Sequence, residues 1–378
     1  MTTINIAVVG MGFGAEFAAI YHRHPNVRKV AIADTNEERL KRVSERFDIP
    51  DCYTSFEEVL KDTSIDAVHV ATGIPDHASQ TIETLRAGKH CACAVPMATT
   101  LDELHEIVDT VNGTGLNYML METTIYDRAF LWVQDELRAG TFGDIQLLRG
   151  SHYQDMENWP PYWAGLPPMW YSTHAISPIL ALADVRATEV HCYGSGTMRD
   201  DLIRRYNNPF PIETAILKLE GIPAVAEVTR ALFHSARPYV ESFDLHGSNA
   251  TFEWQQQWGE KPILFKISAL NDDNRKGPRS SEATDIDLPD YGDRLPSEIA
   301  RFTQRGVYDE NHEHLSFSWG GGHGGSHPHL CHEFVSSIIE GRKARVDEIT
   351  GANWNAPGIC AHSSALAGGE RVNVPTFE

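Results

Sequence analysis

The sequence predicts an α/β protein whose N-terminal part is a doubly wound Rossmann dinucleotide-binding domain. Three observations support this fold class: an apolar run at 4–9, a glycine turn and helical pattern directly after it, and a second apolar run, 29–33, that ends at an aspartate. Strand, glycine turn, helix and strand in this order form the unit that binds dinucleotides. With 378 residues, the chain also has room for a second domain.

The glycine turn is expected to hold the diphosphate of a dinucleotide. Gly10 permits a tight turn, Gly12 lets the backbone approach the diphosphate, and Ala15 keeps the following helix, 16–24, close to the sheet. The first amides of that helix point toward the anion. The turn residues expected to contact the cofactor are Gly10, Gly12, Phe13, Gly14 and Ala15.

The cofactor expected at this turn is NAD rather than NADP. Asp34 follows the second strand, and its carboxylate would accept hydrogen bonds from both hydroxyls of the adenosine ribose. The same carboxylate would repel a 2′-phosphate. The next residues, Thr35 and Asn36, supply no arginine to receive one.

The alternation of strands and helices continues to residue 121. Strands are expected at 67–71, 90–94 and 116–121, and helices at 76–87 and 101–111. Ligands bind beyond the carboxyl ends of the strands in such sheets, so the nicotinamide half of the cofactor should meet the segments that follow them. The cofactor residues expected there are Thr72, His77, Val95 and Pro96.

Composition and charge exclude several classes of protein. The 32 Lys and Arg against 52 Asp and Glu leave a formal charge of −20, which disfavours nucleic-acid and anionic membrane partners. No window approaches the ~20 apolar residues of a membrane span, and the first residues lead directly into a strand, so a cytoplasmic location is expected. The six cysteines make no disulfide framework, and the histidine spacings support no metal site.

Several motifs resemble the glucose–fructose oxidoreductase, inositol dehydrogenase and MocA (Gfo/Idh/MocA) family. The resemblance covers nearly the whole chain and implies a C-terminal α/β domain built on an open, mainly antiparallel sheet. We therefore expect an NAD-binding Rossmann domain at 1–122 and a substrate-binding and oligomerisation domain at 123–378. Besides the glycine turn, the matching segments are 72–77, 87–90, 96–98, 243–251 and 339–342.

One departure from this family concerns proton transfer. Family dehydrogenases usually have Glu-Lys-Pro where this sequence reads Ala94-Val95-Pro96, and that lysine commonly helps to move the proton of the substrate hydroxyl. Valine cannot titrate. Segments 121–126, 171–178 and 322–325 are similar to the NAD-dependent glycosidases of this superfamily, best known from α-N-acetylgalactosaminidases.

The expected catalytic residues are His174, Tyr171, Glu122 and Tyr126. His174 has a side chain suited to proton transfer near neutral pH, although a core histidine is the alternative. Tyr171 shares a helical face with it, and core packing explains that position equally well. Glu122 follows a strand close to the expected nicotinamide, and Tyr126 either orients the sugar and relays a proton or only packs.

Three further residues are expected at the substrate. Trp163 belongs to an aromatic, proline-rich stretch that suits either the C–H face of a sugar or an oligomer contact. Arg230 would bind an anionic substituent or pair with surface acids. His323 lies in the glycine-rich stretch 319–327, which is either a set of turns or a loop over the site.

These residues predict an NAD-dependent glycoside hydrolase that acts by transient oxidation, elimination, hydration and re-reduction. The alternative is an NAD-dependent dehydrogenase of a sugar, cyclitol or glycoside, with His174 in place of the missing lysine and net release of NADH. A non-catalytic sugar or nucleotide sensor is a third possibility, and only Val95 supports it. The expected partners are a small carbohydrate and further copies of this chain, as a dimer or tetramer.

Overall fold

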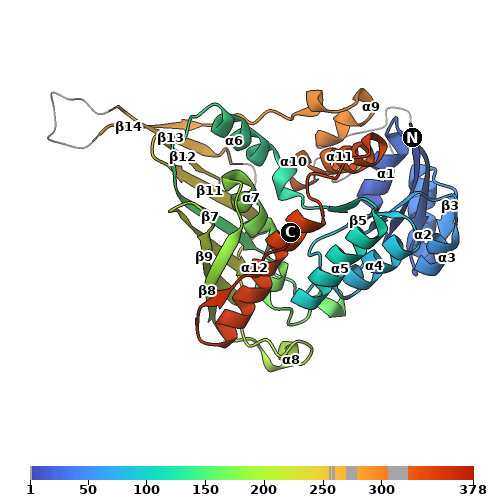
Figure 1. The fold of residues 1–378 in the computed structure, drawn as a ribbon, viewed down its shortest axis with the longest axis horizontal. Coiled ribbons are helices and arrows are strands. Elements are labelled where there is room, and N and C mark those ends of the chain that lie inside the picture. The colour runs from blue at the N-terminus through green and yellow to red at the C-terminus, as the bar shows by residue number, and fades with distance from the viewer. Residues whose placement is uncertain (1, 255–256, 258–259, 270–278, 305–321) are drawn as a thin grey trace. The chain divides into compact units, whose positions relative to one another are not determined.

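A computed structural model describes residues 2–254, 257, 260–269, 279–304 and 322–378, and it divides the chain into two compact units (Figure 1). The first unit contains Met1–Asp127, Asp290–Ala356 and Phe377–Glu378. The second contains Arg128–Pro289 and Pro357–Thr376. The expected division into 1–122 and 123–378 differs from these units, because residues 290–356 pack with the N-terminal segment.

The first unit is built on the expected doubly wound sheet. Its strands run in the order β3-β2-β1-β4-β5-β6, and every pair of neighbours is parallel. The crevice for a dinucleotide opens where the strand order reverses, between β1 and β4. The strands are β1 (Ile4–Val9), β2 (Val27–Ala33), β3 (Asp51–Tyr53), β4 (Ala67–Val70), β5 (His90–Cys93) and β6 (Tyr118–Leu120).

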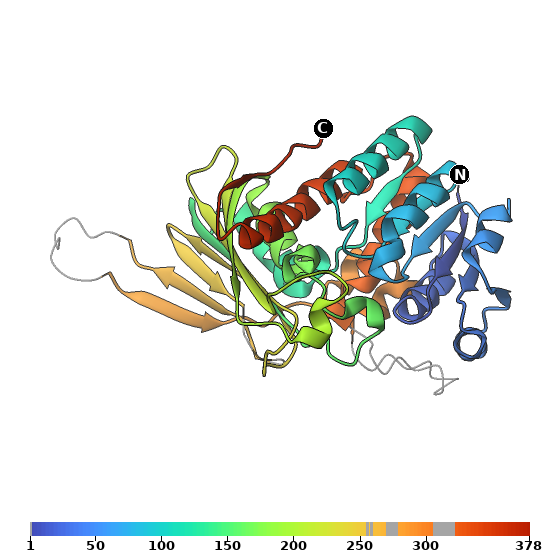
Figure 2. The same cartoon turned by 90° about the horizontal axis from the view of Figure 1, so that it is seen from below.

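Helices cover both faces of this sheet (Figures 1 and 2). The sequence predicted α1 (Ala15–Arg23), α4 (His77–Arg86) and α5 (Leu101–Thr114), with ends that differ by a few residues. The remaining helices of this unit are α2 (Glu37–Phe47), α3 (Phe56–Lys61), η1 (Ile74–Asp76), η2 (Thr124–Tyr126), η5 (Gly292–Arg294), α9 (Ser297–Ala300), η6 (Arg301–Thr303), α10 (Gly322–Gly325) and α11 (His327–Glu340).

The second unit contains a mainly antiparallel sheet, as expected. Its strand order is β14-β13-β12-β11-β7-β10-β9-β8-β15, and only the pair β7 and β10 is parallel. The strands are β7 (Ile145–Tyr153), β8 (Ala187–Ser195), β9 (Ile212–Leu219), β10 (Val225–Ala231), β11 (Val240–Gly247), β12 (Ala250–Glu253), β13 (Ile263–Ile267), β14 (Ser281–Asp285) and β15 (Val372–Asn373).

Helix α7 (Thr173–Ala183) packs on the face of this sheet formed by β7, β10 and β11. A Cβ at Gly150 in β7 would lie 2.0 Å from the carbonyl oxygen of Ala175, so glycine is what lets the start of α7 approach the strand. The other helices are α6 (Arg128–Arg138), η3 (Pro161–Trp163), η4 (Pro168–Tyr171), α8 (Asp200–Ile203) and α12 (Glu348–Leu366), which passes from the first unit into the second.

No helix within the described ranges is both long enough and apolar enough to cross a membrane.

Candidate active site

The glycine turn has the geometry of a diphosphate cradle. Gly10 has φ +93°, and a Cβ there would lie 2.4 Å from the carbonyl oxygen of Ala71, so only glycine fits this position. The close packing assigned to Ala15 falls instead on Gly14, whose Cβ would lie 2.5 Å from the carbonyl oxygen of Gly10. Gly12 is open, with only an Arg39 nitrogen, at 3.9 Å, near its missing Cβ. The turn therefore fits a dinucleotide.

Asp34 joins the end of β2 to this turn. Its Oδ2 accepts a hydrogen bond from the backbone N–H of Met11 at 2.7 Å, and its Oδ1 accepts one from Asn36 at 2.7 Å. The carboxylate also forms an ion pair with Arg39 at 3.2 Å. Thr35 and Asn36 supply no arginine, as expected, but Arg39 reaches the carboxylate from α2, a helix that was not predicted.

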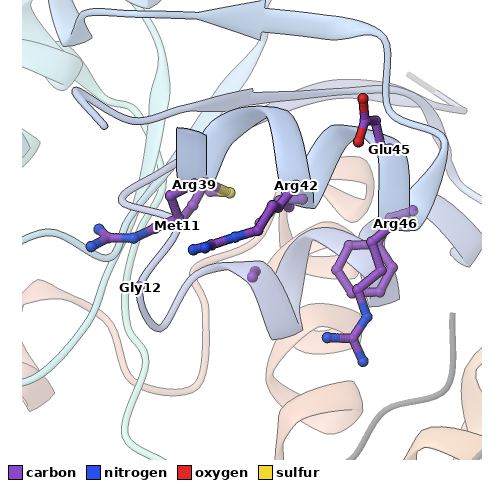
Figure 3. Close-up of a pocket in the computed structure, with 9 residues that line it drawn as sticks. Met11, Gly12, Arg39, Arg42, Glu45 and Arg46 are labelled. Carbon is purple, nitrogen blue, oxygen red and sulfur yellow. The ribbon is translucent and has the colours of Figure 1, made fainter. Parts of the chain in front are cut away.

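A cavity of about 590 Å³ lies beside the turn (Figure 3). Met11 and Gly12 line one part of the cavity. The side chains of Arg39, Arg42 and Arg46, which project from α2, line another. Its position beside Asp34 corresponds to the adenosine end of a dinucleotide in a Rossmann domain. The cavity is therefore rich in positive charge, although the chain as a whole is acidic.

His77 connects the segments that follow β4 and β5. Its ring is buried, with Nδ1 2.8 Å from the carbonyl oxygen of Pro96 and Nε2 3.2 Å from that of Thr72. Burial lowers the pKa of His77, and a neutral imidazole donates from only one nitrogen. Val95 precedes Pro96 through a cis peptide bond. His77 thus lies against both segments expected to meet the nicotinamide, and its one N–H can bind either of them.

Glu122 lies between β6 and the turn η2, and Tyr126 is the last residue of η2. Oε1 of Glu122, which is fully buried, accepts hydrogen bonds from the Thr124 backbone N–H at 3.1 Å and from the Thr124 hydroxyl at 2.8 Å. The Tyr126 ring is nearly parallel to that of His329, with centroids 6.3 Å apart. Burial raises the pKa of Tyr126 well above its usual value, so the phenol keeps its proton.

In the second unit, His174 belongs to a buried polar cluster. Its Nε2 lies 3.3 Å from the Tyr171 hydroxyl and 3.6 Å from Oε1 of Glu241 on β11. The Tyr239 hydroxyl donates to the same carboxylate oxygen. His174 is 3% exposed and Glu241 8%, so solvent screens this pair weakly. The sequence interpretation missed Glu241, whose available signal was that it is one of two acids, with Asp244, in the otherwise largely apolar strand β11.

Arg230 does not have the predicted role of binding an anionic substituent. It is fully buried, and Nε donates to the carbonyl oxygen of Tyr171 at 2.8 Å. Its other nitrogens donate to the carbonyl oxygens of His152 and Ala231 and to Oε1 of Gln154. Burial lowers the pKa of Arg230 to about 10. Its donors are directed at the protein, and it fixes the backbone beside His174.

Trp163 also supports Tyr171. It is buried, and its ring meets the Tyr171 ring edge-on, with centroids 4.8 Å apart. A sugar-stacking face is more readily offered by Trp159, which is 53% exposed. The predicted substrate residue therefore packs behind a predicted catalytic residue.

The structure places the predicted residues in two groups. The first unit holds the glycine turn, Asp34, the residues around His77, and also Glu122, Tyr126 and His323. The second holds Tyr171, His174, Trp163 and Arg230. Among the residues that the structure describes, no group of three or more His, Cys, Asp or Glu is arranged to hold a metal ion.

A parallel sheet in this strand order, a glycine cradle and an aspartate at the end of β2 define a dinucleotide-binding Rossmann domain. Residues 4–121 match the Gfo/Idh/MocA model, described as "Oxidoreductase family, NAD-binding Rossmann fold". The match covers the N-terminal part of the chain, a part in which the motifs predicted a resemblance to that family. The family description also confirms the expectation of NAD.

Two similar proteins have glycosidase names. A glycosyl hydrolase family 109 protein of Porphyromonas gingivalis is 28% identical over 204 residues, which cover 49% of this chain and 44% of that protein. The chain thus spans less than half the length of such relatives. An "Alpha-N-acetylgalactosaminidase" of Shewanella oneidensis is 24% identical over 413 residues, covering 100% of this chain and 85% of that protein.

The solved structures confirm the fold. A levoglucosan dehydrogenase in complex with NADH and levoglucosan superimposes with a TM-score of 0.78, at 19% identity, over 99% of this chain and all of that one. The myo-inositol 2-dehydrogenase of Lactobacillus plantarum gives 0.73 at 16% identity, over 99% of this chain and 100% of that chain.

Proposed function

We propose that the protein is an NAD-dependent glycoside hydrolase that cleaves its substrate through transient oxidation of the sugar. The observation that carries this proposal is the buried pairing of His174 with Tyr171 and Glu241, in a chain that has Val95 where related dehydrogenases have lysine. The family 109 relatives support the same reaction. We assign the NAD contacts named above to 1–122, and substrate binding to 123–378 apart from residues 290–356, which pack with the first unit.

NAD would supply hydride transfer, taking a hydride from a sugar carbon, commonly position 3 in the resembling enzymes, and returning it at the end of the cycle. The cradle at Gly10 and Gly14 and the carboxylate of Asp34 would hold it. His77 would keep the nicotinamide-side segments in place.

The protein's own groups would move protons. The sugar hydroxyl must lose a proton as its carbon is oxidised, and His174 is the group suited to accept it. The carboxylate of Glu241 would stabilise the positive charge that His174 then acquires, and the Tyr171 hydroxyl would orient the imidazole. Tyr126 keeps its proton and would act as a donor.

The ketone would make the adjacent C–H acidic. Removal of the proton from this C–H, for which Glu122 is our candidate base, would expel the aglycon from the anomeric carbon and form a double bond. Water would then add across the double bond, its oxygen at the anomeric carbon and a proton returning to the adjacent carbon, and return of the hydride would restore the hydroxyl. The net reaction consumes one water and releases one sugar and one aglycon, without net oxidation.

A dehydrogenase that releases NADH is the second candidate. His174, directed by Tyr171, would accept the hydroxyl proton as well in that reaction, which has no elimination step, as in the glycosidase reaction. Purified protein should be incubated with a panel of glycosides and catalytic NAD, beginning with p-nitrophenyl α-N-acetylgalactosaminide. Release of p-nitrophenol in excess over NADH would support hydrolysis. NADH formed one-for-one with an intact oxidised glycoside would establish the dehydrogenase instead.

We further propose a carbohydrate substrate, a homo-oligomer and a cytoplasmic location. The glycosidase names of the relatives support the first. Exposed apolar side chains on strands of the second unit, such as Ile216 and Val225, support the second. The six free cysteines are typical of a reducing compartment and support the third.

A further inference from the structure

The segment 322–327 has an unusual backbone conformation. His323 has φ 44° and ψ 54°, and Gly324 and Gly325 also have positive φ. A left-handed conformation is unfavourable for a residue with a Cβ, so neighbouring contacts must hold His323 in it.

Contacts with the glycine turn hold one side of this segment. The ring of Phe13, which lies between Gly12 and Gly14, meets the rings of His323 and His327 edge-on, with centroids 5.9 and 5.6 Å apart. His327 Nδ1 lies 2.9 Å from a carboxylate oxygen of Glu16, in the first turn of α1. That contact gives the Glu16 carboxylate a partner beside the helix end expected to receive the diphosphate.

Contacts with the residues after β6 hold the other side. A Cβ at Gly324 would overlap the carboxylate of Asp127, so the backbone passes directly against that side chain. Tyr126 stacks on His329 one turn further along. The segment therefore extends from the turn that receives the diphosphate to the strand end near the expected nicotinamide, and it runs along the path of the dinucleotide.

We propose that the imidazole of His323 donates a hydrogen bond to the diphosphate of NAD, and that segment 322–327 thereby slows release of the cofactor. His323 is half-buried and set among glycines, which let the backbone approach a ligand. This inference replaces the substrate role predicted for His323. It requires NAD binding only and not the glycosidase reaction.

The test measures cofactor release from the full-length protein in the absence of sugar. The protein is loaded with fluorescent etheno-NAD, and its displacement by excess NAD is followed by fluorescence polarisation. His323→Gly removes the imidazole without adding strain, because glycine adopts positive φ freely. We expect release to become about 10- to 100-fold faster, as for the loss of one hydrogen bond to a charged group.

Two further variants make the test specific. Asn tolerates the left-handed conformation and keeps an N–H donor, so His323→Asn should release the cofactor more slowly than His323→Gly. His22→Ala, at an exposed position on α1, is the matched control and should behave as wild type. Phosphorus NMR of bound NAD should show a shifted diphosphate signal in His323→Gly.

Wild-type release from His323→Gly, an unchanged diphosphate signal, or equal rates for the glycine and asparagine variants would each overturn the proposal. Because no sugar is present, any of these outcomes is distinct from failure of the glycosidase reaction.

Discussion

Replacing Asp34 with alanine should both weaken NAD and admit NADP. In the structure one carboxylate oxygen of Asp34 binds the N–H of Met11 and the guanidinium of Arg39, and the other binds the N–H of Asn36. Asp34→Ala removes the acceptor for the ribose hydroxyls and a hydrogen bond that holds the glycine turn. It also releases Arg39 from its only carboxylate partner in the described part of the chain.

The magnitude follows from those contacts. A hydrogen bond to a charged group contributes roughly 1.5–3 kcal/mol, and each 1.4 kcal/mol changes the affinity about tenfold. The Kd for NAD should therefore rise by about 10- to 100-fold in Asp34→Ala. The Kd for NADP should fall, because a like charge is gone and Arg39 is released to its 2′-phosphate, beside Arg42 in the lining of the same cavity.

Isothermal titration of both cofactors against four proteins provides the assay: wild type, Asp34→Ala, Arg39→Ala and the double variant. The double variant should keep the loss for NAD and lose the gain for NADP, which separates the two effects. Equal affinity of the wild type for NAD and NADP would refute the assignment of Asp34. An unchanged Kd for NAD in Asp34→Ala would refute it as well.

Four further predictions concern other parts of the molecule. His174→Ala should lower turnover by on the order of 10²–10⁴ while the Kd for NAD stays the same, and near-normal turnover would make this histidine a core residue. Glu241→Gln should lower kcat by about 10- to 100-fold and change the pH–rate profile, whereas Glu189→Gln on the surface should do neither. Burial lowers the pKa of His69 to about 3, so the neutral ring favours the folded state fully above pH 6.5 and progressively less as the pH falls below it. The free energy of unfolding, measured with denaturant, should fall by roughly 1.4 kcal/mol per pH unit between these two pKa values. His69→Gln should show a smaller fall. Light scattering should give a mass above that of one chain, and a strictly monomeric mass at micromolar concentration would contradict the oligomer.

The parallel sheet of the first unit was predictable because its central strands are buried on both faces and therefore read as short apolar runs. Helix α2 and strand β3 escaped prediction for the opposite reason. Only Leu40, Val43 and Phe47 of α2 are buried, and β3 has three residues, too few for a pattern. Missing α2 meant missing Arg39, and with it the ion pair of Asp34.

The cluster in the second unit depended on contacts that no local pattern records. Glu241 reaches His174 from a strand far along the chain, and Arg230 is buried because backbone carbonyls from three separate positions accept its hydrogen bonds. A charged residue is exposed in most proteins, so the sequence favoured a surface or ligand role for Arg230. Tertiary hydrogen bonding reversed that prior.

The return of residues 290–356 to the first unit limits how this protein can be cut or recombined. A gene fragment ending at residue 122 would encode all six strands of the Rossmann sheet but not α11, which packs on α1 and brings His327 to 4.5 Å from the Phe17 ring. Such a fragment would expose Phe17 and Tyr21, both fully buried in the intact chain. Residues 1–122 therefore cannot be transferred alone as a nucleotide-binding domain. Exchange of the second unit between homologues requires four junctions, two before residues 290–356 and two after them.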